Sequence, residues 1–237
     1  MFLVTLGPSE TALVLKTPQD EGSLVEAEFM SRLPEADFVL GPTRVVADDN
    51  DLFRGLLSVY HPASSLSSVF DSLHPDAARP ALASVCVEAG LPHQLVPWSV
   101  KLAWATDVAA ALAWLHIQTP FWGDLKTANV VLCTDGHCRL IDYCPGGSTT
   151  MWAPLESDPL HWSSSAKGDV FALGLVLWAI AVEVGSFERE KQDASPLLPW
   201  CPRTPSWFQD LVRSCLEHEP DRRPSARAVY DALPSAR

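Results

Sequence analysis

Two aspartates and an asparagine stand close together in one stretch of the sequence. The run Asp-Leu-Lys-Thr-Ala-Asn extends from Asp124 to Asn129, and Asp142 follows two short apolar segments. Oxygen ligands of this kind suit a hard cation such as Mg²⁺ carried on nucleotide phosphates. Asn129 and Asp142 are therefore candidate metal ligands, and Asp124 is a candidate acceptor for the proton of a substrate hydroxyl.

The apolar segments beside these polar residues predict a hairpin. Residues 130–132 and 140–141 have the composition of short buried strands, and residues 134–136, Thr-Asp-Gly, form a turn between them. Such a hairpin would hold Asn129 and Asp142 near one point in space. An ordinary hairpin with surface acids fits the same pattern, so the interpretation depends on the remainder of the chain.

The polar stretch resembles the catalytic core of the eukaryotic protein kinases. In that family the catalytic loop reads His-Arg-Asp-x-x-x-x-Asn and the metal motif reads Asp-Phe-Gly. The corresponding segments here are residues 122–129, Trp-Gly-Asp-Leu-Lys-Thr-Ala-Asn, and residues 142–144, Asp-Tyr-Cys. Trp122, Tyr143 and Cys144 thus depart from the family's His, Phe and Gly.

The resemblance implies a role for each retained polar residue. Asp124 would orient the acceptor hydroxyl, and Lys126 would steady the γ-phosphate of ATP. Asn129 and Asp142 would hold Mg²⁺. ATP and Mg²⁺ are accordingly the expected cofactors.

A lysine ends the second of two strands predicted near the N-terminus. Residues 2–6 and 11–16 are largely apolar and are separated by the turn sequence Gly-Pro-Ser-Glu, so they predict a hairpin that ends at Lys16. In the kinase family a lysine at such a strand end, on the pattern Val-Ala-Ile-Lys, holds the α and β phosphates. The resemblance assigns this role to Lys16.

Residues 22–33 predict a helix with apolar residues on one face. In the kinase family a glutamate on this helix pairs with the strand lysine. Glu26 fits that position because apolar residues follow it at the family's spacing, and Glu28 is the alternative. The resemblance therefore implies an ion pair between Lys16 and Glu26 beside the phosphates.

Two further strands are predicted over residues 36–47 and 52–60. The sequence Ser-Val-Tyr-His-Pro at the end of the second strand resembles the connection between the two lobes of a kinase. The resemblance places backbone groups near Val59 and His61 against the adenine. It also puts Ser58, a small residue, at the back of that pocket.

The second half of the chain matches the larger kinase lobe. The resemblance implies that Asp169 ties down the catalytic-loop backbone, and that Glu156 of an Ala-Pro-Leu-Glu sequence forms a buried ion pair with Arg223. The apolar middle helix of this region is too short to span a bilayer. The helical patterns cover residues 99–116, 170–182 and 206–217.

The segment from Asp142 to Glu156 is short for a kinase activation segment. It predicts activity that phosphorylation does not switch, because a short segment cannot swing out to recruit arginines. Ser148, which follows a glycine, resembles the family's Gly-Thr hydroxyl that helps to order the catalytic Asp. On this interpretation, replacing Thr149 and Thr150 with Ala changes transfer rates only a few-fold.

Composition limits the class of protein. The chain has 237 residues, 47% of them hydrophobic, which is enough for a sizeable core. Its net charge of −12 argues against nucleic acid or an anionic membrane as partner. The cysteines show no C-x-x-C spacing and no signal peptide is visible, which predicts a cytoplasmic or nuclear protein with reduced thiols.

Together these patterns predict an α+β, two-lobed, protein-kinase-like fold in a single domain over residues 1–237. A β-rich N-lobe would take residues 1–60, without the first strand and Gly-rich loop of the family, and a helical C-lobe would take residues 61–237. The leading function is ATP-dependent phosphoryl transfer to Ser or Thr hydroxyls of a protein substrate. The alternatives are a pseudokinase scaffold that binds a partner, favoured by the missing loop, and a small-molecule kinase.

Overall fold

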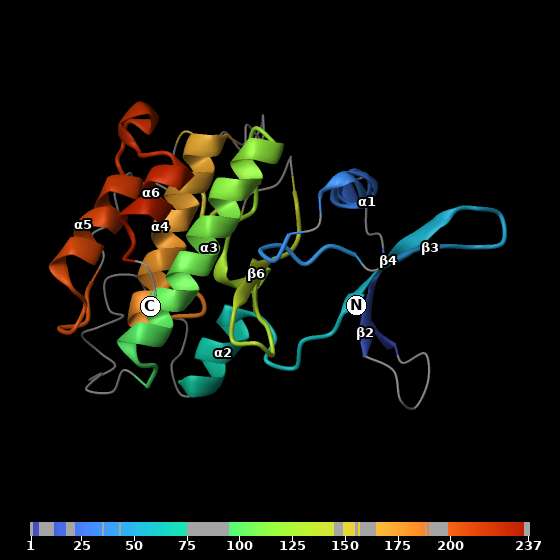
Figure 1. Ribbon diagram of the computed structural model, residues 1–237, viewed down its shortest axis with the longest axis horizontal. Helices are drawn as coiled ribbons and strands as arrows, with labels where there is room; N and C mark the ends of the chain where they lie inside the picture. Colours follow the sequence, from blue (N-terminus) through green and yellow to red (C-terminus); the bar gives the residue numbers. More distant parts are fainter. Residues whose placement is uncertain are drawn as a thin grey trace.

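The structure is a computed structural model. Most of its helices lie on one side of the molecule, and a small sheet with one helix lies on the other side (Figure 1). This α+β arrangement is the one that the sequence predicts. Residues 75–94 lie outside the described residues, as does the predicted turn between the first two strands. The structure describes residues 2–4, 12–17, 22–34, 36–42, 44–74, 95–144, 149–154, 156, 165–187, 189 and 199–234.

The small sheet has four antiparallel strands in the order β1-β2-β4-β3. Strands β1 and β2 pair as the predicted hairpin requires. Lys16, at the end of β2, lies opposite Leu56 of β4. Gly55 permits this close pairing, because a Cβ there would lie 2.4 Å from the Lys16 carbonyl oxygen. The elements are β1 (Phe2–Val4), β2 (Leu13–Lys16), α1 (Gly22–Arg32), β3 (Arg44–Ala47) and β4 (Phe53–Val59).

The strand predicted over residues 36–47 is wrong in its first part. Only Arg44–Ala47 forms a strand, and Pro42 just before it has no N–H to donate to a ladder. The preceding residues turn and contact the other part of the molecule instead. There Leu40 N donates to the Leu140 carbonyl oxygen at 3.0 Å, which links the sheet side of the molecule to its helical side.

Helices α2 to α6 form the larger part of the fold. Figure 1 shows α3 and α4 side by side. Helix α6 packs against α3, and α5 packs against α4. Ser65, Ser165 and Ser225 begin α2, α4 and α6 by accepting a hydrogen bond from a backbone N–H of the first turn. The elements are α2 (Leu66–Leu73), α3 (Trp98–Gln118), β5 (Val130–Leu132), β6 (Cys138–Leu140), α4 (Ala166–Val182), α5 (Ser206–Cys215) and α6 (Ala226–Ala232), with 3-10 turns at Thr127–Asn129 and Pro220–Arg222.

The core is centred on α4, which is buried continuously from Asp169 to Val182. Helix α3 faces it with buried side chains that include Trp104, Leu112 and Leu115. Within the described part of the chain, α3 is the one helix long and apolar enough to cross a membrane. Half of its apolar window is buried inside the fold, however, and core helices commonly pass the same test.

A buried carboxylate joins the end of α4 to the start of α3. Glu183 follows α4 in a left-handed conformation (φ 60°), which residues other than glycine rarely adopt. Its side chain contacts Lys101 Nζ at 2.8 Å, Val96 N at 3.0 Å and His74 Nε2 at 3.0 Å. Burial acts to raise the pKa of the Glu183 carboxyl, but the hydrogen bonds from these groups outweigh burial and lower it.

Replacing Glu183 with Gln tests this network. We expect a loss of unfolding free energy of about 3–5 kcal/mol at neutral pH, because the buried Lys101 ammonium ion loses its counter-charge. The folded-state pKa of Glu183 lies below its ordinary value of 4.5. The carboxylate therefore stabilises the fold above pH 4.5, and this contribution is lost as the pH falls through the folded-state pKa.

Urea unfolding of both proteins over this pH range measures the effect. The wild-type and Glu183→Gln free energies should converge at acid pH, and an equal difference at neutral and acid pH would contradict the charge-based account. Asp231→Asn, which breaks an exposed pair with Arg227, is the matched control. That change should cost less than about 1 kcal/mol.

Candidate active site

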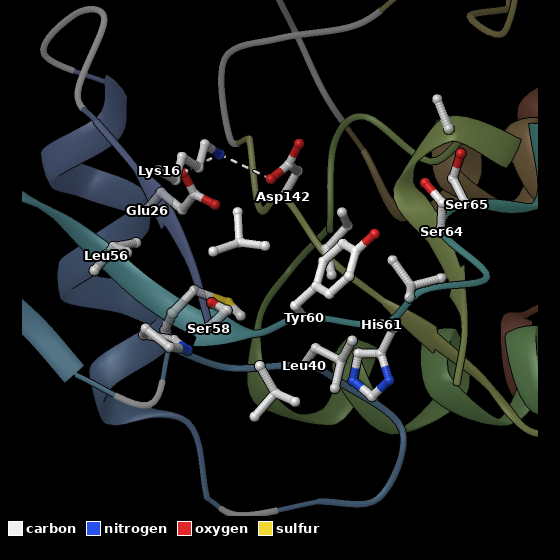
Figure 2. A pocket seen from close by; sticks show the side chains of 17 residues that line it. Lys16, Glu26, Leu40, Leu56, Ser58, Tyr60, His61, Ser64, Ser65 and Asp142 are labelled. Atoms are coloured by element: carbon white, nitrogen blue, oxygen red, sulfur yellow. Dashed lines mark hydrogen bonds and ion pairs between the residues drawn. The ribbon is translucent and has the colours of Figure 1, made fainter. Parts of the chain in front are cut away.

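A cavity of about 250 Å³ lies between the small sheet and the β5–β6 hairpin. Side chains of β2 and β4 form one wall, and Val131 and Ile141 contribute to the other. Figure 2 shows Lys16, Glu26 and Asp142 gathered at one end, with Tyr60 and His61 toward the other. Six residues singled out in the sequence line the cavity: Lys16, Glu26, Ser58, Val59, His61 and Asp142.

The Lys16 ammonium ion lies between two carboxylates. Its Nζ donates to Glu26 Oε2 at 2.6 Å and to Asp142 Oδ1 at 2.8 Å (Figure 2). Burial acts to lower the pKa of Lys16, but the hydrogen bonds to Asp142 and Glu26 outweigh it and raise the pKa, so the lysine is charged. Glu28, the alternative partner, pairs instead with Arg32 on the surface.

Three aromatic rings hold α1 against the loop that carries Asp124. Phe29 of α1 stacks on Tyr143, with ring centroids 3.8 Å apart. The ring centroid of Trp122 lies 6.5 Å from that of Phe29 and 5.4 Å from that of Tyr143. Trp122 is completely buried, and its indole N–H has no hydrogen-bond partner among the described residues. The stack fixes the turn of α1 that carries Glu26, and so directs that carboxylate toward the cavity.

Asn129 and Asp142 come together at the base of the β5–β6 hairpin. Ile141 N donates to the Asn129 carbonyl oxygen at 3.0 Å, so the residue before Asp142 is bonded directly to Asn129. Asp142 has a left-handed backbone (φ 65°), a conformation that clusters at functional sites. The Asn129 amide nitrogen donates to the Asp124 carbonyl oxygen at 2.8 Å, which leaves its amide oxygen as the atom suited to a cation.

Asp124 is held by groups from two segments. Thr149 donates to Asp124 Oδ1 from its backbone N at 2.9 Å and from its hydroxyl at 2.8 Å. Lys126 Nζ lies 2.5 Å from Asp124 Oδ2 and 2.8 Å from the Thr149 hydroxyl. Sequence reasoning missed Thr149, which stands one residue beyond the position that the resemblance indicated. Ser148, the residue expected there, lies outside the described residues.

This contact gives Thr149 a role near Asp124 that the expectation of a harmless Thr149 and Thr150 double replacement did not include. Removing the Thr149 hydroxyl removes one hydrogen bond to Asp124 and one from Lys126. Thr150 is exposed. The two threonines therefore have different expected roles, although they are adjacent in the sequence.

Asp169, near the start of α4, binds the backbone of the loop. Its carboxylate accepts hydrogen bonds from Trp122 N at 2.6 Å and Gly123 N at 2.9 Å, as the resemblance implies. It also contacts His116 Nε2 at 2.9 Å. His116 ends a predicted helix. From the sequence it can be interpreted as catalytic or, preferably, as a packed or surface histidine, because its partner Asp169 lies far along the chain.

A bidentate ion pair joins Glu156 to Arg223. The guanidinium donates to both carboxylate oxygens, with Nη2 3.1 Å from Oε2. The predicted pairing is confirmed, but only its Arg223 side is buried, because the Glu156 side chain is 37% exposed. Arg223 also donates to the carbonyl oxygens of Glu217 and Lys167 and lies over the Phe171 ring, 5.0 Å from its centroid.

The two ends of the cavity differ in charge. Lys16, Glu26 and Asp142 form the charged end. At the other end, burial and the charge of Arg139 lower the pKa of His61, so its imidazole is neutral at neutral pH. Within the described ranges no three His, Cys, Asp or Glu side chains form a metal site, but an Asp–Asn oxygen pair fits Mg²⁺ that is shared with phosphates.

Comparisons with known proteins point to the same family as the motifs. No family model matches the chain. A probable serine/threonine-protein kinase of Dictyostelium discoideum is 27% identical over 185 residues, and a second one from that organism is 30% identical over 165 residues. The serine/threonine-protein kinase Nek4 of Mus musculus is 28% identical over 155 residues.

The chain carries a protein-kinase-like domain. The three matches cover 67%, 58% and 57% of this chain, and 24%, 27% and 20% of the respective relatives. The chain therefore spans about a quarter of these relatives' length or less. The similarity supports a kinase-like function.

The pair of Glu156 and Arg223 gives a stability test. Arg223→Ala should cost about 3–5 kcal/mol, because it removes a buried cation with several carbonyl partners. Glu156→Ala should cost about 1–2 kcal/mol, since this carboxylate is partly solvated and its charge is screened. In a double-mutant cycle by urea unfolding, the loss from Glu156→Ala should nearly vanish once Arg223 is gone, whereas additive losses would mean that the two side chains do not interact.

Proposed function

We propose that this domain transfers the γ-phosphoryl group of ATP to Ser or Thr hydroxyls of a protein substrate. The observation that carries the proposal is the position of Lys16 between Glu26 and Asp142 at the charged end of the cavity. A lysine that two carboxylates hold in place presents a fixed positive charge to an anionic ligand. The similarity to serine/threonine kinases supports the same reaction.

The neutral end of the cavity supports binding of a nucleobase there. Tyr60 N donates to the Ala12 carbonyl oxygen at 2.9 Å, and so faces the sheet. Successive peptide groups of an extended chain point in opposite directions, so the peptide groups of Val59 and His61 are the ones suited to hydrogen-bond the adenine edge. Ser58 contributes a small side chain to the cavity wall.

Each polar residue has one task in the proposed reaction. Bound Mg²⁺ would neutralise charge on the phosphates, with Asp142 and Asn129 as its protein ligands. Lys16 binds phosphate oxygens. Asp124 Oδ2 accepts the proton of the acceptor hydroxyl, and Lys126, beside it, places positive charge where the transferred group passes.

A binding module with little or no catalysis is the second candidate. Trp122 occupies the place of the family's catalytic-loop histidine, and its buried indole N–H cannot supply the hydrogen bonds of an imidazole. In this case ATP would bind without transfer, and a protein partner would replace the substrate.

The metal and nucleotide site can be tested by calorimetry. ATP should bind the wild type more tightly with Mg²⁺ than without it, because Asp142 and Asn129 supply oxygen ligands. Asp142→Asn should lose most of this Mg²⁺-dependent gain, while Asp210→Asn, an exposed acid on α5, should keep it. Equal ATP affinity in all three proteins with and without Mg²⁺ would remove the metal site.

Phosphoryl transfer can be tested with the residues around Asp124. Asp124→Asn should abolish transfer to a generic Ser/Thr protein substrate, because the hydroxyl loses its proton acceptor. Thr149→Val should lower kcat by about 10-fold to 100-fold through misplacement of Asp124. Thr150→Val, the matched control, should stay close to the wild type. If the wild type binds ATP, but neither the wild type nor any variant transfers phosphate, the binding-module function is correct.

A further inference from the structure

Arg189 is a buried arginine to which the proposed reaction assigns no task. It lies beyond the end of α4 and is 5% exposed. Its guanidinium lies over the ring of Phe171, 5.3 Å from the centroid, and Arg223 lies over the same ring at 5.0 Å. Burial of an arginine is costly unless its N–H groups find acceptors. The location of those acceptors therefore shows which segments Arg189 contacts.

Two of the acceptors belong to the turn that carries Thr149. Arg189 Nη2 donates to the Ala153 carbonyl oxygen and, at 3.3 Å, to that of Thr150. Its backbone N contacts the sulfur of Met151 at 3.2 Å. Within the turn, Ala153 N donates to the Thr149 carbonyl oxygen at 3.1 Å. A continuous line of hydrogen bonds thus runs from Arg189 through the turn to Thr149.

The chain that leads to Arg189 is itself anchored. Thr127, in the loop after Asp124, donates through its hydroxyl to the Gly185 carbonyl oxygen at 2.5 Å. A Cβ at Gly185 would lie 2.5 Å from both Asp71 Oδ1 and the Ser67 carbonyl oxygen, so this stretch packs closely against α2. The stretch before Arg189 is therefore held on the loop that bears Asp124.

We propose that Arg189 is a positioning residue that holds residues 149–154, so that Thr149 stays bonded to Asp124. The guanidinium acts on backbone carbonyl oxygens, and charge-assisted hydrogen bonds of this kind are stronger than neutral ones. Thr149 then contributes both its N–H and its hydroxyl to one carboxylate oxygen of Asp124. The effect on catalysis rests on the proposed phosphoryl transfer, but the effect on the turn does not.

Two variants separate packing from hydrogen bonding. Arg189→Met keeps the length of the side chain over Phe171 and removes its donors, and Arg189→Lys keeps one charged donor. Arg213→Met is the matched control, because Arg213 also lies over an aromatic ring, that of Trp200 at 6.0 Å, but is 56% exposed and distant in sequence from the turn. The wild type and all three variants are measured as the full chain.

Hydrogen exchange of the nucleotide-free protein gives the first measurement. In Arg189→Met, the Thr149, Trp152 and Ala153 amides should exchange at least about tenfold faster than in the wild type, with α3 and α4 unchanged. Arg189→Lys should be intermediate, and Arg213→Met should match the wild type. Unchanged exchange at residues 149–154, or an equal increase throughout the helices, would overturn the positioning role.

Kinetics give the second measurement. Arg189→Met should lower kcat by about 10-fold to 100-fold and leave KM for ATP unchanged, because the misplaced group is Asp124 and not the nucleotide site. A rise in KM for ATP at constant kcat would contradict the proposal. If the wild type shows no transfer, the proposed function fails, and the exchange data alone decide whether Arg189 holds the turn.

Discussion

The ammonium ion of Lys16 lies 2.6 Å from a Glu26 oxygen and 2.8 Å from an Asp142 oxygen. These three groups belong to β2, to α1 and to the chain that follows β6. Partly buried charges are costly when they lose their partners, so separating any of the three elements would leave a charge uncompensated. This constraint draws the sheet, α1 and the hairpin around one cavity, and it fixes the Lys16 ammonium group at one end of that cavity.

Helix α4 provides the corresponding support on the other side of the site. Its sequence is apolar from Val170 to Val182, so its ionisable side chains lie near its start, and Glu183 follows its end. Asp169 at its start holds the backbone of the loop that carries Asp124, and Glu183 at its end holds the start of α3. Arg189, just beyond, reaches the turn of Thr149. The buried helix α4 thus positions several loops through the polar residues at and just beyond its two ends.

Residues that belong to a local motif could be predicted from the sequence. Asp124, Asn129 and Asp142 follow a recognisable spacing, and the hairpin that brings two of them together is short enough to be identified from its apolar pattern. Lys16 and Glu26 could be paired only through the resemblance to kinases. Thr149, His116 and Glu183 carried no such signal, because their partners lie tens of residues away and a single polar residue in a loop or at a helix end has many explanations.

The sequence by itself determined the α+β class, the kinase-like motifs and the existence of the buried helix α4, because hydrophobic periodicity and motif spacing are local properties. Only the tertiary structure decided that Glu26 and not Glu28 meets Lys16, and that Thr149 holds Asp124. It also decided that Glu156 remains partly solvated while Arg223 is buried. The physical reason is that such contacts depend on the rotation of a helix and on the path of a turn, which packing against distant elements sets.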